Sequence, residues 1–124
     1  MPLYSIDCYN LHANCNNKYR AGGVAVFVRN YLNAVINTDY SLNSADILSV
    51  DCNIGGLKLS ILCVYRLHSV NISEFVVEFN SILSAVKSKN VLVLGDINID
   101  ILSNSRLIDE YKLMMGKSWP KIFD

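Results

Sequence analysis

The side chains best suited to chemistry follow an apolar run near residue 90. The segment reads NVLVLGDINIDIL (residues 90–102), and Asp96 and Asn98 stand two residues apart directly after Gly95. A carboxylate and an amide at this spacing can serve a catalytic site, supply oxygen ligands to calcium, or cap a tight turn. The flanking elements must distinguish between these three interpretations.

The calcium interpretation fails on spacing. An EF-hand loop needs oxygen ligands at positions 1, 3 and 5, glycine at position 6 and glutamate at position 12. Asp96, Asn98 and Asp100 match the first three positions. Ile101 and Leu107 then stand at positions 6 and 12, and a predicted strand precedes the loop where a helix belongs. Turn and capping chemistry remains, and spacing alone favours it over a catalytic role.

Three elements around the motif predict a β-α-β unit. Residues 57–65 are expected to form a strand, residues 71–89 an amphipathic helix, and residues 91–94 a short central strand. A helical crossover joins parallel strands, whose carboxyl ends meet at one edge of the sheet. Tyr65 ends the first strand and Asp96 follows the second. Both side chains are therefore expected at the edge where open α/β sheets bind ligands.

Capping signals set the expected ends of two helices. Asn71 with Glu74 resembles a capping box at the start of the first helix. A second helix is expected over residues 105–115, with Gly116 as its stop.

A β-hairpin is predicted before the β-α-β unit. Residues 48–54 alternate between apolar and polar, a Gly-Gly pair at residues 55–56 suits a type I′ turn, and residues 57–66 return. In the register that this turn sets, Cys52 and Cys63 lie on different rungs, which disfavours a disulfide between them.

The N-terminal third is less regular. Residues 11–23 are rich in polar and turn-forming types and are expected to form a loop, followed by a strand over residues 24–30. Residues 31–36 are ambiguous, and residues 37–46 are expected to form another loop.

The amino-acid composition limits the classes of protein to which the chain can belong. Hydrophobic residues make up 52% and charged residues 18% of the 124 residues, which predicts one packed domain over residues 1–124. Eleven basic residues balance eleven acidic ones, and this zero net charge argues against a chain that binds DNA without help from another domain. No apolar run approaches the roughly 20 residues of a membrane span. The start lacks a signal peptide, so an intracellular protein, nuclear or cytoplasmic, is expected.

A zinc site near the N-terminus is disfavoured. Cys8, His12 and Cys15 lie close together in the sequence, but a closed zinc site needs a fourth ligand at suitable spacing, and none is present. Reduced thiols are the expectation for an intracellular chain.

Four ordered blocks resemble a known family. The chain is similar to the endonuclease/exonuclease/phosphatase superfamily, and most similar to the endonuclease domain of non-LTR (LINE-type) retrotransposons. The resemblance covers nearly the whole chain. Its blocks are AGGVAVFVRN (21–30), VYR (64–66), GDINIDIL (95–102) and EYKLMMGKSWPKIFD (110–124).

This resemblance implies a fold, a reaction and partners. The family fold is a four-layered α/β sandwich of the deoxyribonuclease type, and its reaction is metal-dependent phosphodiester hydrolysis that nicks DNA. The implied cofactor is Mg²⁺ or Mn²⁺. The implied partners are DNA and a reverse transcriptase domain in a parent polyprotein, with no membrane.

The resemblance also implies roles for three residues. Asp96 would orient or deprotonate the attacking water, and Asn98 would hold Asp96 and the phosphate in place. Tyr65 would contact the reacting phosphate through its hydroxyl. In-line attack needs such a base together with donors for the charge that builds on the phosphate oxygens.

The chain also departs from the family pattern. Leu67 and His68 stand where the family has prolines. The family's metal-binding glutamate and an early asparagine, which lie upstream of this region, have no counterpart. Its terminal aspartate–histidine pair also has none, and His12 and His68 stand at the wrong points in the chain to replace that histidine. The sequence thus predicts the central fragment of a nuclease domain that is inactive alone. The alternative is a non-catalytic α/β protein-interaction module.

Overall fold

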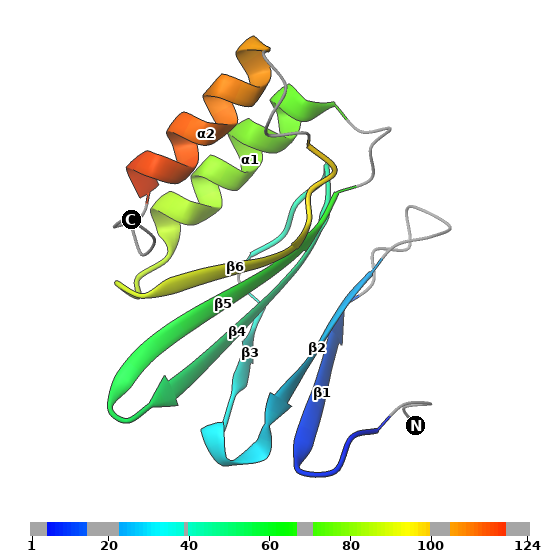
Figure 1. The fold of residues 1–124 in the computed structure, drawn as a ribbon, viewed down its shortest axis with the longest axis vertical. Coiled ribbons are helices and arrows are strands. Elements are labelled where there is room, and N and C mark those ends of the chain that lie inside the picture. Colours follow the sequence, from blue (N-terminus) through cyan, green and yellow to red (C-terminus); the bar gives the residue numbers. More distant parts are fainter. Residues whose placement is uncertain (1–4, 15–22, 39, 67–70, 100–104, 119–124) are drawn as a thin grey trace.

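The chain folds into two β-sheets and two α-helices. The computed structural model describes residues 5–14, 23–38, 40–66, 71–99 and 105–118. Within these residues, a two-stranded sheet (β1-β2) and a four-stranded sheet (β3-β4-β5-β6) give a mixed α/β fold (Figure 1). The elements in chain order are β1 (Tyr9–Asn14), β2 (Val24–Arg29), the 3-10 helix η1 (Asn30–Leu32), β3 (Val35–Asn37), β4 (Asp46–Ile54), β5 (Leu57–Tyr65), α1 (Ile72–Ala85), β6 (Val91–Asp96) and α2 (Arg106–Ser118).

The predicted hairpin is confirmed. β4 and β5 pair antiparallel with Ile54 opposite Leu57, the register that a two-residue turn dictates. Gly55 and Gly56 have φ angles of 57° and 86°, the positive values that a type I′ turn requires. The buried Cys52 and Cys63 are free thiols, as the register predicted.

The β-α-β unit is confirmed as well. β5 and β6 pair in parallel, and α1 forms the crossover between them. The Asn71 side chain caps α1 by accepting hydrogen bonds from the backbone N–H groups of Ser73 (2.8 Å) and Glu74 (3.4 Å). The helix ends at Ala85 rather than at residue 89, because Val86 adopts an extended conformation.

The interpretation of residues 91–94 as a central strand is wrong for the described part of the chain. β6 is longer than predicted, and it lies at one edge of the four-stranded sheet. A run of apolar residues suggested burial on both faces, but the Leu94 side chain is 44% exposed. The apolar strand thus presents one unpaired edge among the described residues.

The N-terminal loop prediction is wrong at its start. Residues 11–14 belong to β1, which pairs with β2 from Tyr9 opposite Arg29 to Asn14 opposite Val24. The face of β1 that turns toward the four-stranded sheet carries the polar His12 and Asn14, so the sequence lacks apolar alternation there. The ambiguous segment after β2 contains the end of η1 and most of β3.

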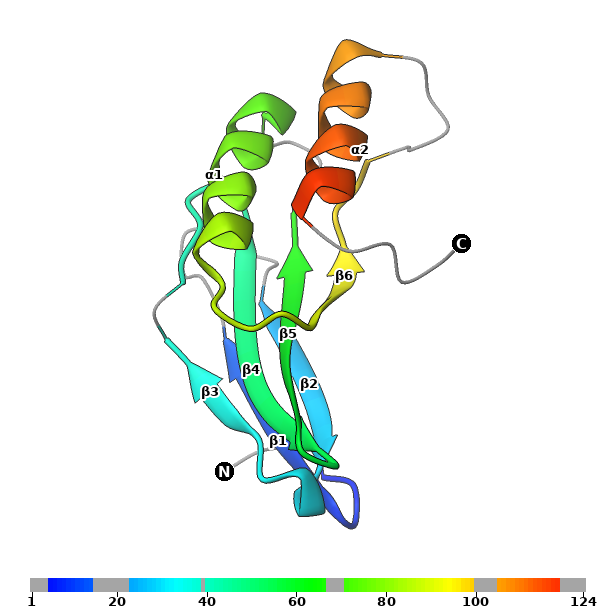
Figure 2. The same ribbon diagram turned by 90° about the vertical axis from the view of Figure 1, so that its left-hand side faces the viewer.

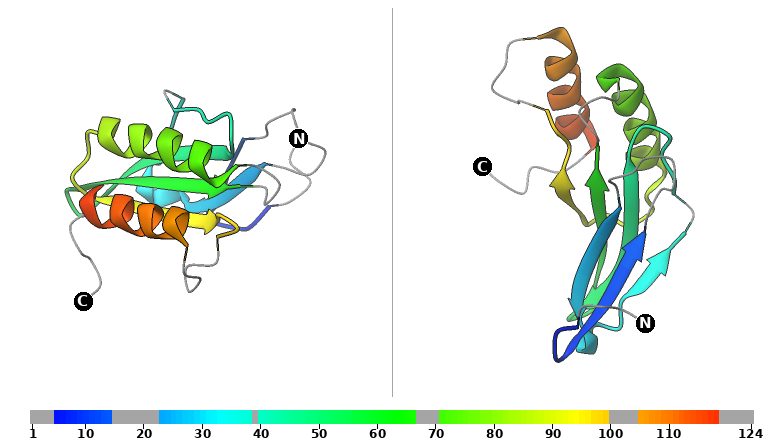
Figure 3. Two further views of the ribbon diagram at one scale, coloured as in Figure 1. Left: turned by 90° about the horizontal axis from the view of Figure 1, so that it is seen from above. Right: turned by 90° about the vertical axis from the view of Figure 1, so that its right-hand side faces the viewer.

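Three layers follow from these elements. Figure 1 shows the two helices on one side of the four-stranded sheet and the β1-β2 ribbon on the other. The views in Figure 3 agree, because α1 and α2 lie side by side in the first view and the ribbon crosses β4 and β5 in the second. Among the described residues, neither helix is long and apolar enough to cross a membrane.

Two apolar clusters fill the spaces between the layers. The cluster under the helices includes Ile47, Leu62, Val64, Phe75 and Phe79. The cluster under the ribbon is smaller and consists of Val28, Leu48, Val50 and Cys63, with partly buried neighbours.

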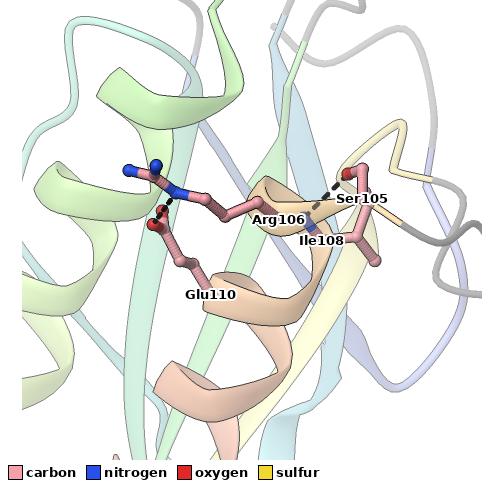
Figure 4. Close-up of polar contacts among 4 residues, drawn as sticks. All are labelled: Ser105, Arg106, Ile108 and Glu110. Atoms are coloured by element: carbon pink, nitrogen blue, oxygen red, sulfur yellow. Dashed lines mark hydrogen bonds and ion pairs between the residues drawn. The ribbon is translucent and has the colours of Figure 1, made fainter.

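Helix α2 begins at a serine cap. The Ser105 hydroxyl accepts a hydrogen bond from the backbone N–H of Ile108 at 3.2 Å, and Arg106 pairs with Glu110 one turn later at 3.3 Å (Figure 4). The helix continues through Gly116 to Ser118, so the prediction of a stop at Gly116 is wrong. Glycine lowers helix stability by about 1 kcal/mol without forbidding the conformation.

Candidate functional site

Three chemically active side chains lie in one row across three strands. Asp46 at the start of β4 is the register partner of Tyr65 at the end of β5, and Tyr65 is the partner of Asp96 at the end of β6. Register partners project from the same face of a sheet. This row shares its face with Leu48 and Cys63, which is the face that the β1-β2 ribbon covers. The predicted meeting of Tyr65 and Asp96 at one edge is therefore confirmed.

Exposure differs along the row. Asp46 is only 5% exposed, Tyr65 is half-buried, and Asp96 is open to solvent. The Tyr65 hydroxyl makes no hydrogen bond within the described part of the chain. A ligand that enters from solvent therefore meets the Asp96 carboxylate first, with the phenol beside it.

Gly95 is required by the close approach of β6 to β5. Its φ angle is 127°, a conformation that residues with a side chain rarely adopt. A Cβ atom at this position would lie 2.0 Å from the Val64 carbonyl oxygen. The glycine before Asp96 thus allows the strand to end against its neighbour and to present the carboxylate at the edge.

The turn after Gly95 is closed by its own polar groups. The backbone N–H of Asn98 donates a hydrogen bond to Asp96 Oδ1 at 2.9 Å, which makes an Asx-turn. Asn98 has a φ angle of 52°, a left-handed conformation that asparagine tolerates better than most residues. The Asn98 side-chain amide donates to the Arg66 carbonyl. The predicted turn chemistry is thus present, and one Asp96 oxygen is already engaged in it.

Arg66 holds this turn in place through hydrogen bonds to its backbone. Its side chain is 1% exposed, and its guanidinium donates to the Ile97 and Asn98 carbonyls, at 2.6 Å in each case. Its backbone N–H donates to the Asp96 carbonyl at 2.9 Å. Burial lowers the pKa of the Arg66 guanidinium, and the nearby Asp96 charge opposes that shift. Arg66 therefore holds three residues of the turn, Ile97 and Asn98 through its guanidinium and Asp96 through its backbone N–H.

Asp46 occupies the buried end of the row. Its Oδ2 accepts a hydrogen bond from the backbone N–H of Gly23, and its Oδ1 is buried with no hydrogen-bond partner among the described residues. One residue further along, the Asn14 amide donates to the Ile47 carbonyl at 2.6 Å. Both contacts join the β1-β2 ribbon to the start of β4, beside the row.

The arrangement at the open end can carry out limited chemistry. The second oxygen of Asp96 is available to orient a water molecule or accept its proton, and the Tyr65 hydroxyl can donate to an anionic oxygen. This pairing suits attack by water on a group that develops negative charge on its oxygens.

The described residues do not complete a metal site. They contain no group of three or more His, Cys, Asp or Glu side chains placed to hold an ion. Asp46 and Asp96 stand two strand spacings apart, roughly 10 Å between their Cα atoms, and Tyr65 lies between them in the row. The Mg²⁺ or Mn²⁺ that the resemblance implies therefore has no cluster of three such ligands within the part of the chain that the structure describes. Asp100 and Cys15, considered as calcium and zinc ligands, lie outside the described residues.

Sequence reasoning gave no role to Arg66 and did not place Asp46 in the row. Extending the alternation of residues 48–54 back by two positions would have put Asp46 on the face of Leu48 and Val50. No pattern in the sequence marks Arg66 as buried, because its partners are backbone carbonyls about thirty residues away.

No protein-family model matches the chain, and no curated protein matches it.

Proposed function

We propose that the chain is the central part of a metal-dependent endonuclease domain of the endonuclease/exonuclease/phosphatase type, related to those of non-LTR retrotransposons. Its reaction class is phosphodiester hydrolysis in DNA, within a parent polyprotein that also carries a reverse transcriptase domain. The chain alone does not cleave DNA.

The observation that carries the proposal is the register of Tyr65 with Asp96. A water-activating carboxylate and a phenolic donor end adjacent parallel strands and project from the same face. A phosphodiester placed over this edge meets Asp96 on the side of the attacking water and Tyr65 at its oxygens. Asn98 and Arg66 keep the turn in shape, so that the carboxylate stays in position.

The layers support the four-layered sandwich of this proposal. Helices, a four-stranded sheet and a two-stranded sheet supply three successive layers. On the outer face of the ribbon, Leu11 and Phe27 are partly exposed, as expected for a surface that further helices cover in the complete domain. The edge of β6 that pairs with no described strand suits pairing with another strand.

The predicted inactivity of the chain alone follows from the side chains that the candidate site contains. Asp96, Asn98 and Tyr65 provide a base, an orienting group and a phosphate contact. They provide no metal anchor and no general acid for the leaving group. Without a metal, the charge of the phosphate repels the Asp96 carboxylate.

One observation favours a second function, a non-catalytic interaction module. Asp96 Oδ1 and the Asn98 amide both serve hydrogen bonds within the turn, as they would in a purely structural motif. In that case the exposed edge of β6 is the interaction surface, and Asp96 matters only for stability.

Nicking of supercoiled plasmid tests the isolated chain. With Mg²⁺ or Mn²⁺, we expect no nicking by the purified chain above the level of an Asp96→Ala variant. Asp109→Ala, which removes an exposed carboxylate from α2, is the matched control for charge. Metal-dependent nicking that survives in Asp109→Ala and disappears in Asp96→Ala would show that the chain is a complete enzyme.

The encoding DNA separates the two functions. A continuous reading frame with a glutamate-bearing segment before Met1, and an aspartate–histidine pair after Asp124, supports the endonuclease. A promoter and translation start at Met1, without those segments, supports the interaction module.

A further inference from the structure

The four-stranded sheet has a polar trough on its helix-bearing face, at the end distant from Asp96. Figure 2 shows that α1 and α2 lie over the half of the sheet near the ends of β5 and β6, while neither of them lies over the half toward the β4–β5 turn. The trough lies over this second half and has a volume of about 600 Å³. That volume is within the usual range of small-molecule sites, about 300 to 1,000 Å³.

Strand register places the floor of the trough. Val35, Asp51 and Ser60 form one row across three strands, and Asn53 with Lys58 forms the next row. These positions alternate in phase with Leu62, which faces the helices. The face is apolar where helices cover it and polar where they do not. The polar trough therefore follows from the side chains that the strands place on this part of the sheet.

The segment after α1 forms one wall. The Ser88 hydroxyl and the Asn90 amide both donate to the Lys58 carbonyl, at 3.1 and 3.2 Å. These bonds fix the segment against the start of β5 and place Lys87 beside Lys58 at the trough. Two ammonium groups thus line the same cavity from two different elements.

Hydrogen bonding leaves the trough rich in donors. The Asp51 carboxylate, its one described acid, is engaged through Oδ1 by the Ser60 hydroxyl (2.8 Å) and through Oδ2 by the Asn37 amide (3.4 Å). Asn53 Oδ1 accepts from the backbone N–H of Gly56 at 2.9 Å, which leaves its Nδ2 available to a ligand. The groups that remain for a ligand are mainly donors and cations.

We propose that the trough binds a soluble phosphate monoester of mononucleotide size. Lys58, Lys87 and the Asn53 amide take the phosphate, because ammonium and amide N–H groups are donors suited to an anion. Tyr40 and Val35 border the cavity and contact the apolar body of the ligand. This site is at the opposite end of the sheet from the Asp96 turn. Ligand binding there can therefore be tested independently of endonuclease activity.

Titration of the full chain with AMP, followed by ¹H–¹⁵N NMR, tests the site. We expect saturable shifts of the Lys58, Ser60 and Lys87 amides with a Kd below about 10 mM, and no such shifts with adenosine, which lacks the phosphate. Equal binding of adenosine would overturn the assignment of an anion site. Absence of saturable shifts with AMP would overturn the site itself.

Variants that remove lysine charges distinguish a defined phosphate site from non-specific attraction of the anionic ligand to the protein surface. Lys58→Gln with Lys87→Gln should weaken AMP binding by roughly 10-fold or more while the spectrum stays dispersed. Lys89→Gln removes a neighbouring exposed lysine that does not line the trough, and it should leave the affinity within about 2-fold. An equal loss in Lys89→Gln, or no loss in the double variant, would contradict the proposal.

Discussion

The two faces of the four-stranded sheet are packed in different ways. On the helix side, Phe75 and Phe79 are fully buried and their rings stack with centroids 5.4 Å apart. On the ribbon side, a smaller cluster around Leu48 and Val50 fills the space. On the same side, His12 Nε2 is buried and has no hydrogen-bond partner in the described segments.

The contrast agrees with the proposed placement of the functional site on the ribbon side and of most of the stabilising core on the helix side. The helix layer has a large aromatic core that holds the β-α-β unit together. The row of Asp46, Tyr65 and Asp96 faces the other side, where less apolar surface is buried and a carboxylate oxygen lacks a partner. Functional sites commonly concentrate such unfavourable features, and the rest of the fold offsets them.

The largest expected effect is on the helix side. Phe79→Ala should lower the free energy of unfolding by about 3 to 5 kcal/mol, because it opens a cavity in a close-packed aromatic cluster. Chemical denaturation measures the loss. Val77→Ala, at a position 68% exposed on the same helix, should change stability little. Equal losses in both variants would show that α1 does not pack as described.

A smaller effect is expected on the ribbon side. Leu48→Ala should lower the free energy of unfolding by about 2 kcal/mol, near the low end for such changes, because the thinner layer can partly collapse into the space. Hydrogen exchange should also show β1 and β2 opening before β5 and α1. A Leu48→Ala loss as large as that of Phe79→Ala, with uniform protection, would remove the distinction between the faces.

Replacing the unpartnered imidazole should stabilise the ribbon. His12→Leu should raise the free energy of unfolding by about 1 kcal/mol, because the imidazole Nε2 is buried and makes no hydrogen bond to the described residues. Thermal unfolding at neutral pH measures the gain. Destabilisation would mean that the imidazole contributes an interaction worth more than its desolvation.

The smallest effect concerns alkaline pH. Burial raises the pKa of the Cys63 thiol above its ordinary 9.0, so the folded chain keeps this proton at pH values where the unfolded chain releases it. Stability should therefore be unaffected below pH 9 and should fall as pH rises from there through the folded pKa. Burial also raises the pKa of Tyr111 on the helix side, where the corresponding loss begins near its ordinary 10.0.

A variant that lacks the Cys63 thiol tests whether this group causes the loss of stability that begins near pH 9. Cys63→Ala should flatten the dependence of the unfolding free energy on pH between about 9 and 10. An unchanged slope in Cys63→Ala would assign the alkaline loss to other groups.

Local patterns predicted the regular parts of this fold. The Gly-Gly turn fixed the hairpin register, and the helical crossover required parallel strands that bring Tyr65 and Asp96 together. Asn71 marked the start of α1, because its side chain can satisfy N–H groups that a helix leaves unpaired.

The failures arose where long-range contacts override local pattern. β1 was missed because its inward face carries His12 and Asn14, whose environment is set by distant β4. The edge position of β6 could not be read from its apolar sequence. Arg66 gave no signal, since backbone carbonyls about thirty residues away bind its guanidinium.

The central claim is that Asp96 serves catalysis in a complete endonuclease domain rather than only closing a turn. The direct measurement is the Mg²⁺-dependent rate of plasmid nicking by the protein expressed from the extended reading frame, compared with its Asp96→Asn variant. Asparagine keeps an oxygen that can accept the Asn98 N–H, so the turn and the melting temperature should persist. We expect nicking by the parent protein and a loss of about 10²- to 10⁴-fold in the variant. Equal rates, or no nicking by the folded extended protein, would contradict the claim.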